Sequence, residues 1–325
     1  MIKGKAVRAL GRKDAVTKVY MEQNNIFADA FNYYIFGGQQ VIMPERLKAL
    51  DITELAVPYG ADSAGEPEQK YRDVMKSLTA MYDEQAAYLL LGIENQSDVN
   101  YAMPVKNLLY DALNYAKQVQ EAAASHREEK DYKGHNQGEF LSGFYKEDKL
   151  IPVITLVIFF SPDPWDGPMT LREMMSVRDK RLLSLVPDYQ VHLIAPSGLS
   201  DEGLDKFRTT LREVLAFIKY SKDMDKLDKI VNDNFRNLRK NEIDVLNQCV
   251  NAKLRLEEGE EELIVCKALE DMKKNAAQKA TEETRKITHL EDIKNVMEAF
   301  HVSAEQAMKA LKIPESESSR FLSML

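Results

Sequence analysis

The carboxylates of Asp73 and Glu94 could together hold a divalent cation if the fold brings them close. Glu94 follows the apolar run "LLLGI" and opens the polar tripeptide Glu94-Asn95-Gln96. Hard cations such as Mg²⁺ bind oxygen ligands, often one or two carboxylates together with water and a substrate phosphate. Such an ion activates a bound water and neutralises negative charge that develops on a phosphate. These residue types therefore indicate metal-assisted hydrolysis of a phosphate ester.

A predicted β-hairpin brings the two carboxylates together. Two extended segments flank the sequence "AMYDEQ" (80–85), which has the composition of a turn. If the turn is centred between Asp83 and Glu84, paired residue numbers keep a constant sum, and Asp73 lies opposite Glu94. Opposed residues of an antiparallel pair have Cβ atoms about 5 Å apart, so two like charges there destabilise the pair. Because a bound cation would turn that repulsion into attraction, we predict Asp73 and Glu94 as metal ligands.

Two further residues at the end of this strand complete the predicted site. The side-chain period of two places Glu94 and Gln96 on one face of the sheet and Asn95 on the other. The carbonyl oxygen of Asn95 could supply a third metal ligand. Gln96 could orient the attacking water or hold a phosphate oxygen, so we group it with Asp73 and Glu94 as a predicted catalytic residue.

The segments around this hairpin predict an α/β fold. A helix at 104–126 begins at a proline, and its apolar stripe consists of Leu108, Leu109, Ala112, Leu113, Ala116 and Val119. The apolar run 150–160 indicates a strand that is buried on both faces, as in the centre of a mixed sheet. We expect a mixed sheet of about five strands flanked by helices. The remaining helices are predicted at 14–36, 44–50 and 201–223, and further strands at 51–60 and 188–196.

The composition indicates a sizeable apolar core and an acidic surface. The 325 residues are 44% hydrophobic and 30% charged, and the formal net charge is -8. An acidic protein does not favour nonspecific adhesion to nucleic acid or to an anionic membrane. A DNA-binding surface on this chain must therefore be local. The candidates for such a surface are Lys70, Arg72, Lys76, Lys106 and Lys117.

Cysteine use and hydropathy indicate a reducing, cytoplasmic setting. Cys249 and Cys266 form neither a zinc motif nor a disulfide framework. The five histidines do not cluster at ligand spacings, which disfavours a zinc site. The N-terminus lacks the apolar segment of a signal peptide, and the longest apolar run, 150–160, is too short to span a bilayer. We therefore expect no membrane partner.

The composition changes beyond about Ser221, where Lys, Glu, Asp and Asn dominate and strand signals nearly vanish. We therefore predict one domain at residues 1–220 and a helical C-terminal region at 221–325. The last part of that region, from Leu290, is predicted to form three short helices that pack or recruit a protein partner. A DNA-reading helix-turn-helix is the alternative, but these helices carry few basic residues.

The polar end of the strand resembles the motif of a known nuclease superfamily. Asp73, followed by Glu94-Asn95-Gln96 at the end of an apolar strand, is similar to the motif of the PD-(D/E)XK nucleases. The longer sequence "YLLLGIENQSDVNYAMPVKNLLYDALNYAKQV" resembles the transposase-like, recombination-promoting nuclease (Rpn) branch of that superfamily. The resemblance covers roughly residues 1–200, and the hairpin with the following helix is its specific part.

Further residues carry the resemblance to this branch, among them Met103, Pro104 and Phe31. In the branch, Glu-x-Gln-Ser is followed by Met-Pro, a basic residue and a tyrosine one helical turn on. Lys106 and Tyr110 stand at the last two of these positions. The sequence "FADAFNYYIF", which contains Asp29, resembles the opening helix of the branch.

The resemblance implies a PD-(D/E)XK (restriction-endonuclease-like) mixed sheet flanked by helices. It also implies a Mg²⁺- or Mn²⁺-dependent DNA endonuclease that hydrolyses phosphodiester bonds in transposition or recombination. The expected DNA contacts are Arg72, Lys106, Tyr110 and Asp29. Contacts made mainly to the sugar-phosphate backbone would weaken as salt rises. Paired cuts need two sites, which leaves a homodimer open.

The sequence departs from the superfamily pattern at two positions. Gln96 replaces the superfamily's lysine, as is usual in this branch, and supplies no positive charge to the transition state. Lys106 replaces the branch's arginine and offers phosphate no bidentate fork. The alternative function is therefore a catalytically weak or inactive nuclease fold that acts as a DNA- or protein-binding regulatory module.

Structural roles are the alternatives for single residues. Glu94 could be an ordinary polar strand end, and Asp29 could be a helix surface or cap residue. Lys106 near a helix start could simply be solvated, and Tyr110 could pack with a satisfied hydroxyl.

Overall fold

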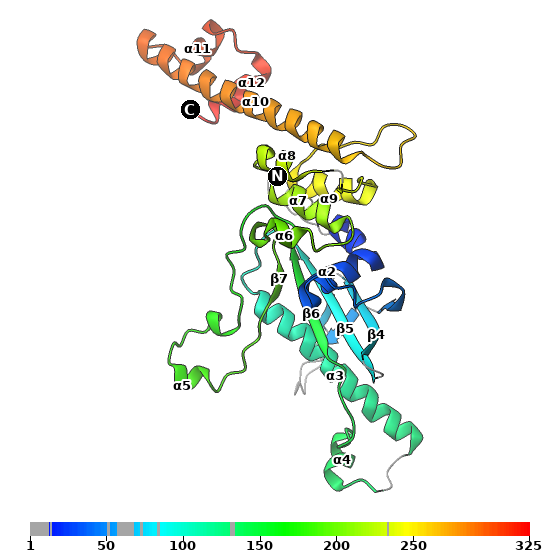
Figure 1. Cartoon of the computed structure of the whole chain (residues 1–325). Coiled ribbons are helices and arrows are strands. Elements are labelled where there is room, and N and C mark those ends of the chain that lie inside the picture. Colours follow the sequence, from blue (N-terminus) through cyan, green and yellow to red (C-terminus); the bar gives the residue numbers. More distant parts are fainter. Residues whose placement is uncertain are drawn as a thin grey trace. The chain divides into compact units, whose positions relative to one another are not determined.

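The fold is described from a computed structural model of the whole chain (Figure 1). The structure describes residues 13, 15–50, 53–56, 68–71, 74–82, 85–130, 134–232 and 234–325. The chain divides into two compact units, Met1–Val265 and Cys266–Leu325, which we call unit 1 and unit 2. Each unit is described by itself.

Unit 1 contains a mixed five-stranded sheet of strand order β1-β4-β5-β6-β7. The pairs β1/β4 and β4/β5 are antiparallel, and the pairs β5/β6 and β6/β7 are parallel. This arrangement confirms the predicted α/β class and the mixed sheet of five strands. The strands are β1 (Leu47–Ala49), β4 (Val74–Tyr82), β5 (Gln85–Gln96), β6 (Val153–Phe159) and β7 (His192–Ile194). A separate two-stranded sheet pairs β2 (Thr53–Ala56) with β3 (Glu68–Tyr71).

The β4–β5 pairing has the register that the sequence predicts. Tyr82 pairs with Gln85 at the turn, and Val74 pairs with Ile93 at the far end. The predicted constant sum of paired residue numbers therefore holds over the whole ladder. The turn residues Asp83 and Glu84 lie outside the described residues, and so does Asp73.

The parallel pairs of the sheet require crossover connections, and helix α3 (Met103–Glu129) forms part of the first. Pro104 lies in its first turn, where a missing N–H has no effect on helical hydrogen bonding. Helix α2 (Asn24–Phe36) buries Ile26, Phe27, Ala30 and Phe31, as their helical spacing predicts. It ends at Gly37, whose φ of 61° is the left-handed conformation that favours glycine.

Shorter helices complete unit 1. The α-helices are α4 (Gln137–Ser142), α5 (Lys180–Leu183), α6 (Asp201–Leu204), α7 (Leu211–Lys219), α8 (Met224–Ile230) and α9 (Lys240–Val250). The single 3₁₀ turns are η1 (Pro44–Arg46), η2 (Arg172–Met174) and η3 (Pro196–Gly198). Among the described residues, no helix is long and apolar enough to cross a membrane.

Three predicted helices are wrong in extent. The segment 14–36 is interrupted by a turn at residues 22–23, and α2 begins only after it. The segment 44–50 forms only the turn η1 before it enters β1, where Leu47 pairs with Leu78. The segment 201–223 divides into α6 and α7 instead of forming one helix. The break has a physical cause, because Asp29 accepts the backbone N–H groups of Arg208 and Thr209 just before α7.

The boundary between the units lies after residue 265, whereas the sequence predicts it after residue 220. Residues that follow α7 bond back to that helix. Arg212 donates from Nη1 to the carbonyl of Asn234 at 3.2 Å, and the N–H of Arg236 donates to Oε1 of Glu213 at 3.0 Å. These contacts attach α8, α9 and the chain between them to unit 1.

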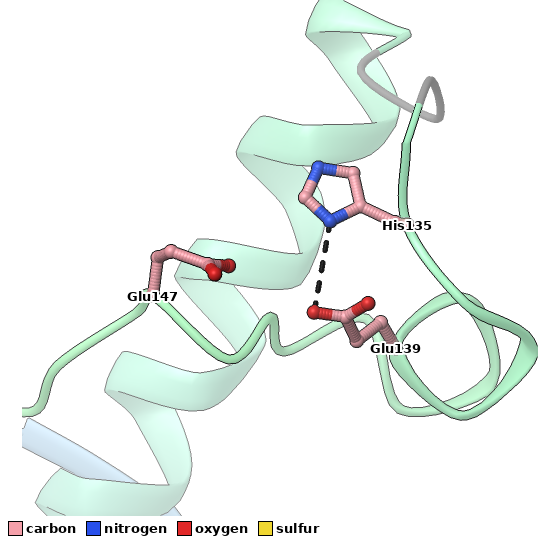
Figure 2. A group of neighbouring side chains, drawn as sticks. All are labelled: His135, Glu139 and Glu147. Atoms are coloured by element: carbon pink, nitrogen blue, oxygen red, sulfur yellow. Dashed lines mark ion pairs between the residues drawn. The ribbon is translucent and has the colours of Figure 1, made fainter.

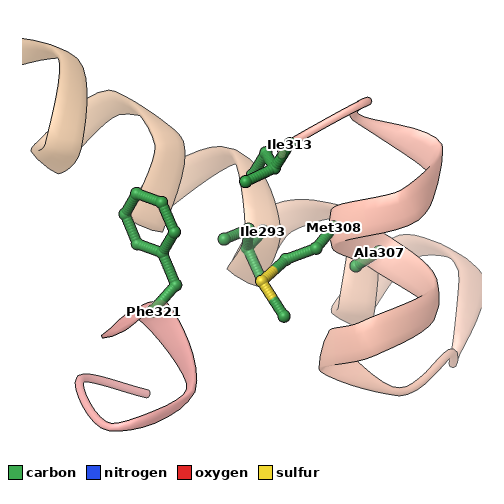
Figure 3. Close-up of a cluster of buried hydrophobic side chains, with 5 residues drawn as sticks. All are labelled: Ile293, Ala307, Met308, Ile313 and Phe321. Carbon is green, nitrogen blue, oxygen red and sulfur yellow. The ribbon is translucent and has the colours of Figure 1, made fainter. Parts of the chain in front are cut away.

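Unit 2 consists of helices that pack around a small apolar cluster. They are α10 (Val265–Phe300), α11 (Ala304–Ala310) and α12 (Glu315–Leu322). The side chain of Ser303 caps α11 by accepting the N–H of Gln306. The first of the three predicted short helices is the end of the 36-residue α10. The cluster consists of Ile293, Ala307, Met308, Ile313 and Phe321 (Figure 3).

Candidate functional site

The predicted site lies where β5 ends, beside β6. Glu94 is the parallel-register neighbour of Val157, and Gly92 is the neighbour of Thr155. Val157 is fully buried and shares a cluster with Met103, the first residue of α3. The sheet positions next to Glu94 are therefore covered by the beginning of α3.

A hydrogen bond fixes the next turns of α3 on the same part of the sheet. The hydroxyl of Thr155 donates to Oδ1 of Asp111 at 2.7 Å, and the hydroxyl of Tyr189 donates to Oδ2 at 2.6 Å. Met103 and Asp111 are two turns apart on one face of α3, since residues four apart lie one above the other. Helix α3 thus runs along β6 from Val157 toward Thr155.

The buried face of α3 is polar, whereas the sequence predicts an apolar one. Leu108 and Leu109 of the predicted stripe are 37% and 40% exposed. The prediction was wrong because apolar spacing alone does not show which face meets the sheet. Thr155 and Tyr189 supply hydrogen-bond partners that the spacing does not reveal. The buried residues of α3 are Met103, Pro104, Asn107, Tyr110, Asp111, Asn114 and Ala123.

Asn107 is the residue of this face that the sequence reasoning missed. It lies between Met103 and Asp111 on the same face, and its side chain is fully buried. Neither Nδ2 nor Oδ1 of its amide forms a hydrogen bond within the described part of the chain. A buried amide without a partner destabilises a fold by about 1–3 kcal/mol. Such groups commonly mark a catalytic role or a missing ion or water. Only the residue's place one turn from Met103 could have drawn attention to it in the sequence.

Two other predicted site residues bond to each other. Asn95 is buried, with 3% of its surface exposed, and Gln96 is half-buried. Nε2 of Gln96 donates to the carbonyl oxygen of Asn95 at 2.9 Å. The predicted third metal ligand therefore already accepts a hydrogen bond from the predicted catalytic amide. Glu94 is described by its backbone alone, and Asp73 and Arg72 lie outside the described residues.

Lys106 and Tyr110, two residues that the sequence predicts as DNA contacts, lie close together on α3. Nζ of Lys106 lies 5.7 Å from the centroid of the Tyr110 ring. Tyr110 is 6% exposed, which agrees with the packing alternative, whereas Lys106 is only half-buried. The ammonium group of Lys106 thus lies within cation–π range of the Tyr110 ring.

Lys76 and Asp29 do not form the DNA-binding surface that the sequence predicts. Lys76 is 3% exposed, and its ammonium group donates to the carbonyl of Glu22 at 2.6 Å and to Oδ1 of Asn24. Burial lowers its pKa. A buried ammonium group with these partners is not available to a phosphate, so this part of the predicted surface is wrong.

Asp29 is 1% exposed and holds two distant parts of unit 1 together. Its carboxylate accepts the N–H groups of Arg208 and Thr209 at 2.8–2.9 Å and the hydroxyl of Thr209 at 2.6 Å. Burial raises the pKa of this carboxyl, although the hydrogen bonds from Thr209 and Arg208 oppose that shift. Asp29 therefore has a structural role, and the expectations of a DNA contact and of an exposed helix position are both wrong.

A separate group of side chains could hold a metal ion, and the sequence reasoning did not predict it. One ligand atom from each of His135, Glu139 and Glu147 lies within 4.8 Å of the others (Figure 2). Nδ1 of His135 lies 3.7 Å from Oε1 of Glu139. The spacing of these two residues, four apart, was the available signal.

The Glu139 carboxylate of this group already has a structural role at the start of α4. It accepts the N–H of Asn136 at 2.8 Å and the N–H of Lys146 at 3.0 Å. The bond from Asn136 is the largest cause of the lowered pKa of Glu139. Glu147 is exposed. Capping and the contact with His135 therefore account for Glu139 without a metal.

Comparisons with known proteins give no relatives for this chain. No family model matches it, no curated protein matches it, and no solved structure matches it. The site must therefore be interpreted from its own geometry and chemistry.

Proposed function

We propose that the chain is a Mg²⁺-dependent DNA endonuclease of the PD-(D/E)XK type, from the transposase-like, recombination-promoting branch. The observation that supports this most is the β4–β5 register, in which Val74 opposes Ile93. The pairing of Asp73 with Glu94 that the sequence predicts would continue this register by one step, although Asp73 itself lies outside the described residues. The mixed sheet, with antiparallel β4/β5 and parallel β5/β6, also agrees with the expected fold.

The donor set fits a hard cation. Two carboxylates and a backbone carbonyl are the oxygen ligands that Mg²⁺ prefers. The buried amide of Asn107 forms no hydrogen bond to any described residue, and it lies on the face of α3 whose Met103 packs with Val157, the register neighbour of Glu94. A water or phosphate oxygen in a ligand shell at Glu94 would satisfy that amide. Bound Mg²⁺ would supply Lewis-acid stabilisation of the charge that develops on the phosphate.

The protein's own groups have separate tasks in the proposed reaction. Asp73 and Glu94 hold the cation, and Asn107 donates a hydrogen bond to an oxygen atom next to it. Gln96 leaves the carbonyl of Asn95 and turns its amide to the phosphate or to the attacking water. Lys106 lies at the beginning of the same helix and attracts the DNA backbone.

A plasmid-nicking assay with Mg²⁺ or Mn²⁺ tests this function. Asp73→Asn and Glu94→Gln keep the size of each side chain but remove its charge. Each should lower the nicking rate by about 100-fold or more, the usual effect of removing one group that stabilises the transition state. Isothermal titration with Mn²⁺ should show the loss of metal affinity independently of activity.

Glu45→Gln is the matched control, because Glu45 is exposed on η1 and outside the proposed site. It should nick as fast as the wild-type chain. If Glu94→Gln and Asp73→Asn also retain the wild-type rate, the site is assigned to the wrong residues.

One observation favours the alternative function, a nuclease fold that serves as a DNA- or protein-binding regulatory module. The amide of Gln96 bonds to the chain's own backbone, and glutamine supplies no cation for the transition state. If the wild-type chain binds DNA but never nicks it with Mg²⁺ or Mn²⁺, this alternative replaces the enzyme.

A further inference from the structure

Unit 2 contains a cavity whose lining is strongly basic. The cavity has a volume of about 220 Å³ and lies between α10 and α12. It is smaller than the roughly 300–1,000 Å³ of pockets that enclose drug-sized ligands, and so it suits a small charged group. Its lining residues are Arg285, Lys286, His289, Glu317, Arg320 and Phe321.

The three cations of this cavity form no ion pair with the side chains that the structure describes. Within the described part of the chain, none of Arg285, Lys286 and Arg320 forms an ion pair, even though Glu317 shares the cavity. Nε of Arg285 donates to Nε2 of His289 at 3.2 Å, and this bond uses one of the three guanidinium nitrogens. Like charges gathered in one cavity repel one another, and an anion between them would reverse that effect.

The apolar cluster of unit 2 fixes the position of these cations. Phe321 is 1% exposed within that cluster (Figure 3). Its ring lies edge-on to His289, with the ring centroids 5.9 Å apart. Arg320 precedes Phe321 on α12, and Arg285 lies one turn before His289 on α10. The packing of one aromatic residue therefore brings cations from two helices to the same cavity.

The charge distribution of the chain also favours unit 2 as the place for an anion. Residues 266–325 contain ten Lys and Arg and ten Asp and Glu, so their formal charge is zero. The formal net charge of -8 therefore belongs entirely to residues 1–265. A polyanion that approaches unit 2 meets less long-range repulsion than one that approaches the rest of the chain.

We propose that this cavity binds a backbone phosphate of DNA and that unit 2 holds the substrate of the proposed nuclease. This inference rests on the proposed function for the identity of the polyanion. Arg285 and Arg320 donate to phosphate oxygens, and Lys286 adds a point charge. Because no base edge is contacted, the binding does not depend on DNA sequence.

Fluorescence anisotropy of a labelled DNA duplex with the full chain tests the cavity. Measurements are made in EDTA, so that binding is separated from any metal-dependent cleavage. The double variant Arg285→Ala/Arg320→Ala should reduce the slope of log affinity against log salt by about 1.8, because each lost phosphate contact contributes about 0.9. If the affinities converge near 1 M salt, the loss at 0.1 M is on the order of 60-fold.

Two further variants make the test specific. Lys294→Ala/Lys309→Ala removes the same charge from exposed positions of unit 2 outside the cavity, and it should keep the wild-type salt slope within about 0.5. Glu317→Gln removes the carboxylate of the cavity and should strengthen binding. Far-UV circular dichroism should show unchanged helix content in all three variants.

The outcomes separate this inference from the proposed function. If the two double variants weaken binding equally, or if Arg285→Ala/Arg320→Ala binds like the wild type, the cavity is not a phosphate site. That result leaves the nicking assay of Glu94→Gln unaffected. If the cavity variant loses binding while the wild type never nicks DNA, the phosphate site stands and the nuclease assignment fails.

Discussion

The interiors of the two units differ in their chemistry. Unit 1 buries charged side chains, among them Asp29 at 1% exposure and Glu213 at 0%. In unit 2, the buried side chains that the structure describes are all apolar (Figure 3). One unit thus depends on directional contacts between buried polar groups, and the other depends on packing alone.

The two kinds of interior constrain the surrounding side chains to different degrees. Buried charges need specific partners, as Asp29 has in Arg208 and Thr209 and as Glu213 has in the N–H of Arg236. Burial also raises the pKa of Glu213, which shows that its environment disfavours the charged form. Such contacts fix the arrangement of the elements around a site. An apolar cluster sets fewer constraints on the surface above it, and the basic cavity of unit 2 lies beside such a cluster.

Asp29→Ala should have the largest effect and should affect unit 1. It leaves the N–H groups of Arg208 and Thr209 without their acceptor, and each donor that loses its partner away from water costs about 1–3 kcal/mol. Trp165 is the only tryptophan and lies in unit 1. Urea unfolding followed by tryptophan fluorescence therefore measures this loss.

Asp98→Ala is the control. It lies at an exposed position and should change the free energy of unfolding by less than about 0.5 kcal/mol. If Asp29→Ala has only a small effect, unit 1 does not depend on its buried charged groups in the way the comparison with unit 2 requires.

Ile293→Ala should destabilise unit 2 by about 2–4 kcal/mol, because Ile293 is fully buried in its cluster. The helical signal in circular dichroism should melt earlier, while the tryptophan transition keeps its midpoint. Ile287→Ala is the matched control on the same helix, since Ile287 is 58% exposed. If the tryptophan transition shifts together with the helical signal, the two units unfold as one. Their interiors then cannot be compared as independent cores.

Asn107→Leu should have the smallest effect on stability and the opposite sign. Replacing a buried amide that lacks a hydrogen-bond partner with an apolar side chain of similar size should leave unit 1 unchanged or more stable by about 1 kcal/mol. The nicking rate should fall, since the amide is proposed to bind an oxygen atom beside the cation. A clear loss of stability would mean that the amide has a structural partner. Asn107 would then stabilise unit 1 like its other buried polar groups, and the proposed role beside the cation would be wrong.

The parts of the fold that the sequence predicted are those that depend on neighbouring residues. The β4–β5 register follows from the position of a turn, and β6 follows from a continuous apolar run. The register also made Glu94 and Asp73 a candidate pair. The buried residues along β6 agree with its place as an inner strand between β5 and β7.

The parts that the sequence did not predict depend on partners far along the chain. Asp111 is buried because Thr155 and Tyr189 bond to it from 44 and 78 residues away. Apolar periodicity could not reveal that a polar face of α3 meets the sheet. In the same way, the basic cavity of unit 2 forms only when Phe321 packs on α10.

The bond between Asp29 and Arg208 also affects the order in which the chain folds during synthesis. The two residues are 179 positions apart. At about 5–20 residues per second, the ribosome needs roughly 10–35 s to add the segment that separates them. During that interval the Asp29 carboxylate lacks its partners, so α2 cannot reach its buried native environment. Unit 1 therefore completes its fold late in translation, after its sheet strands have emerged.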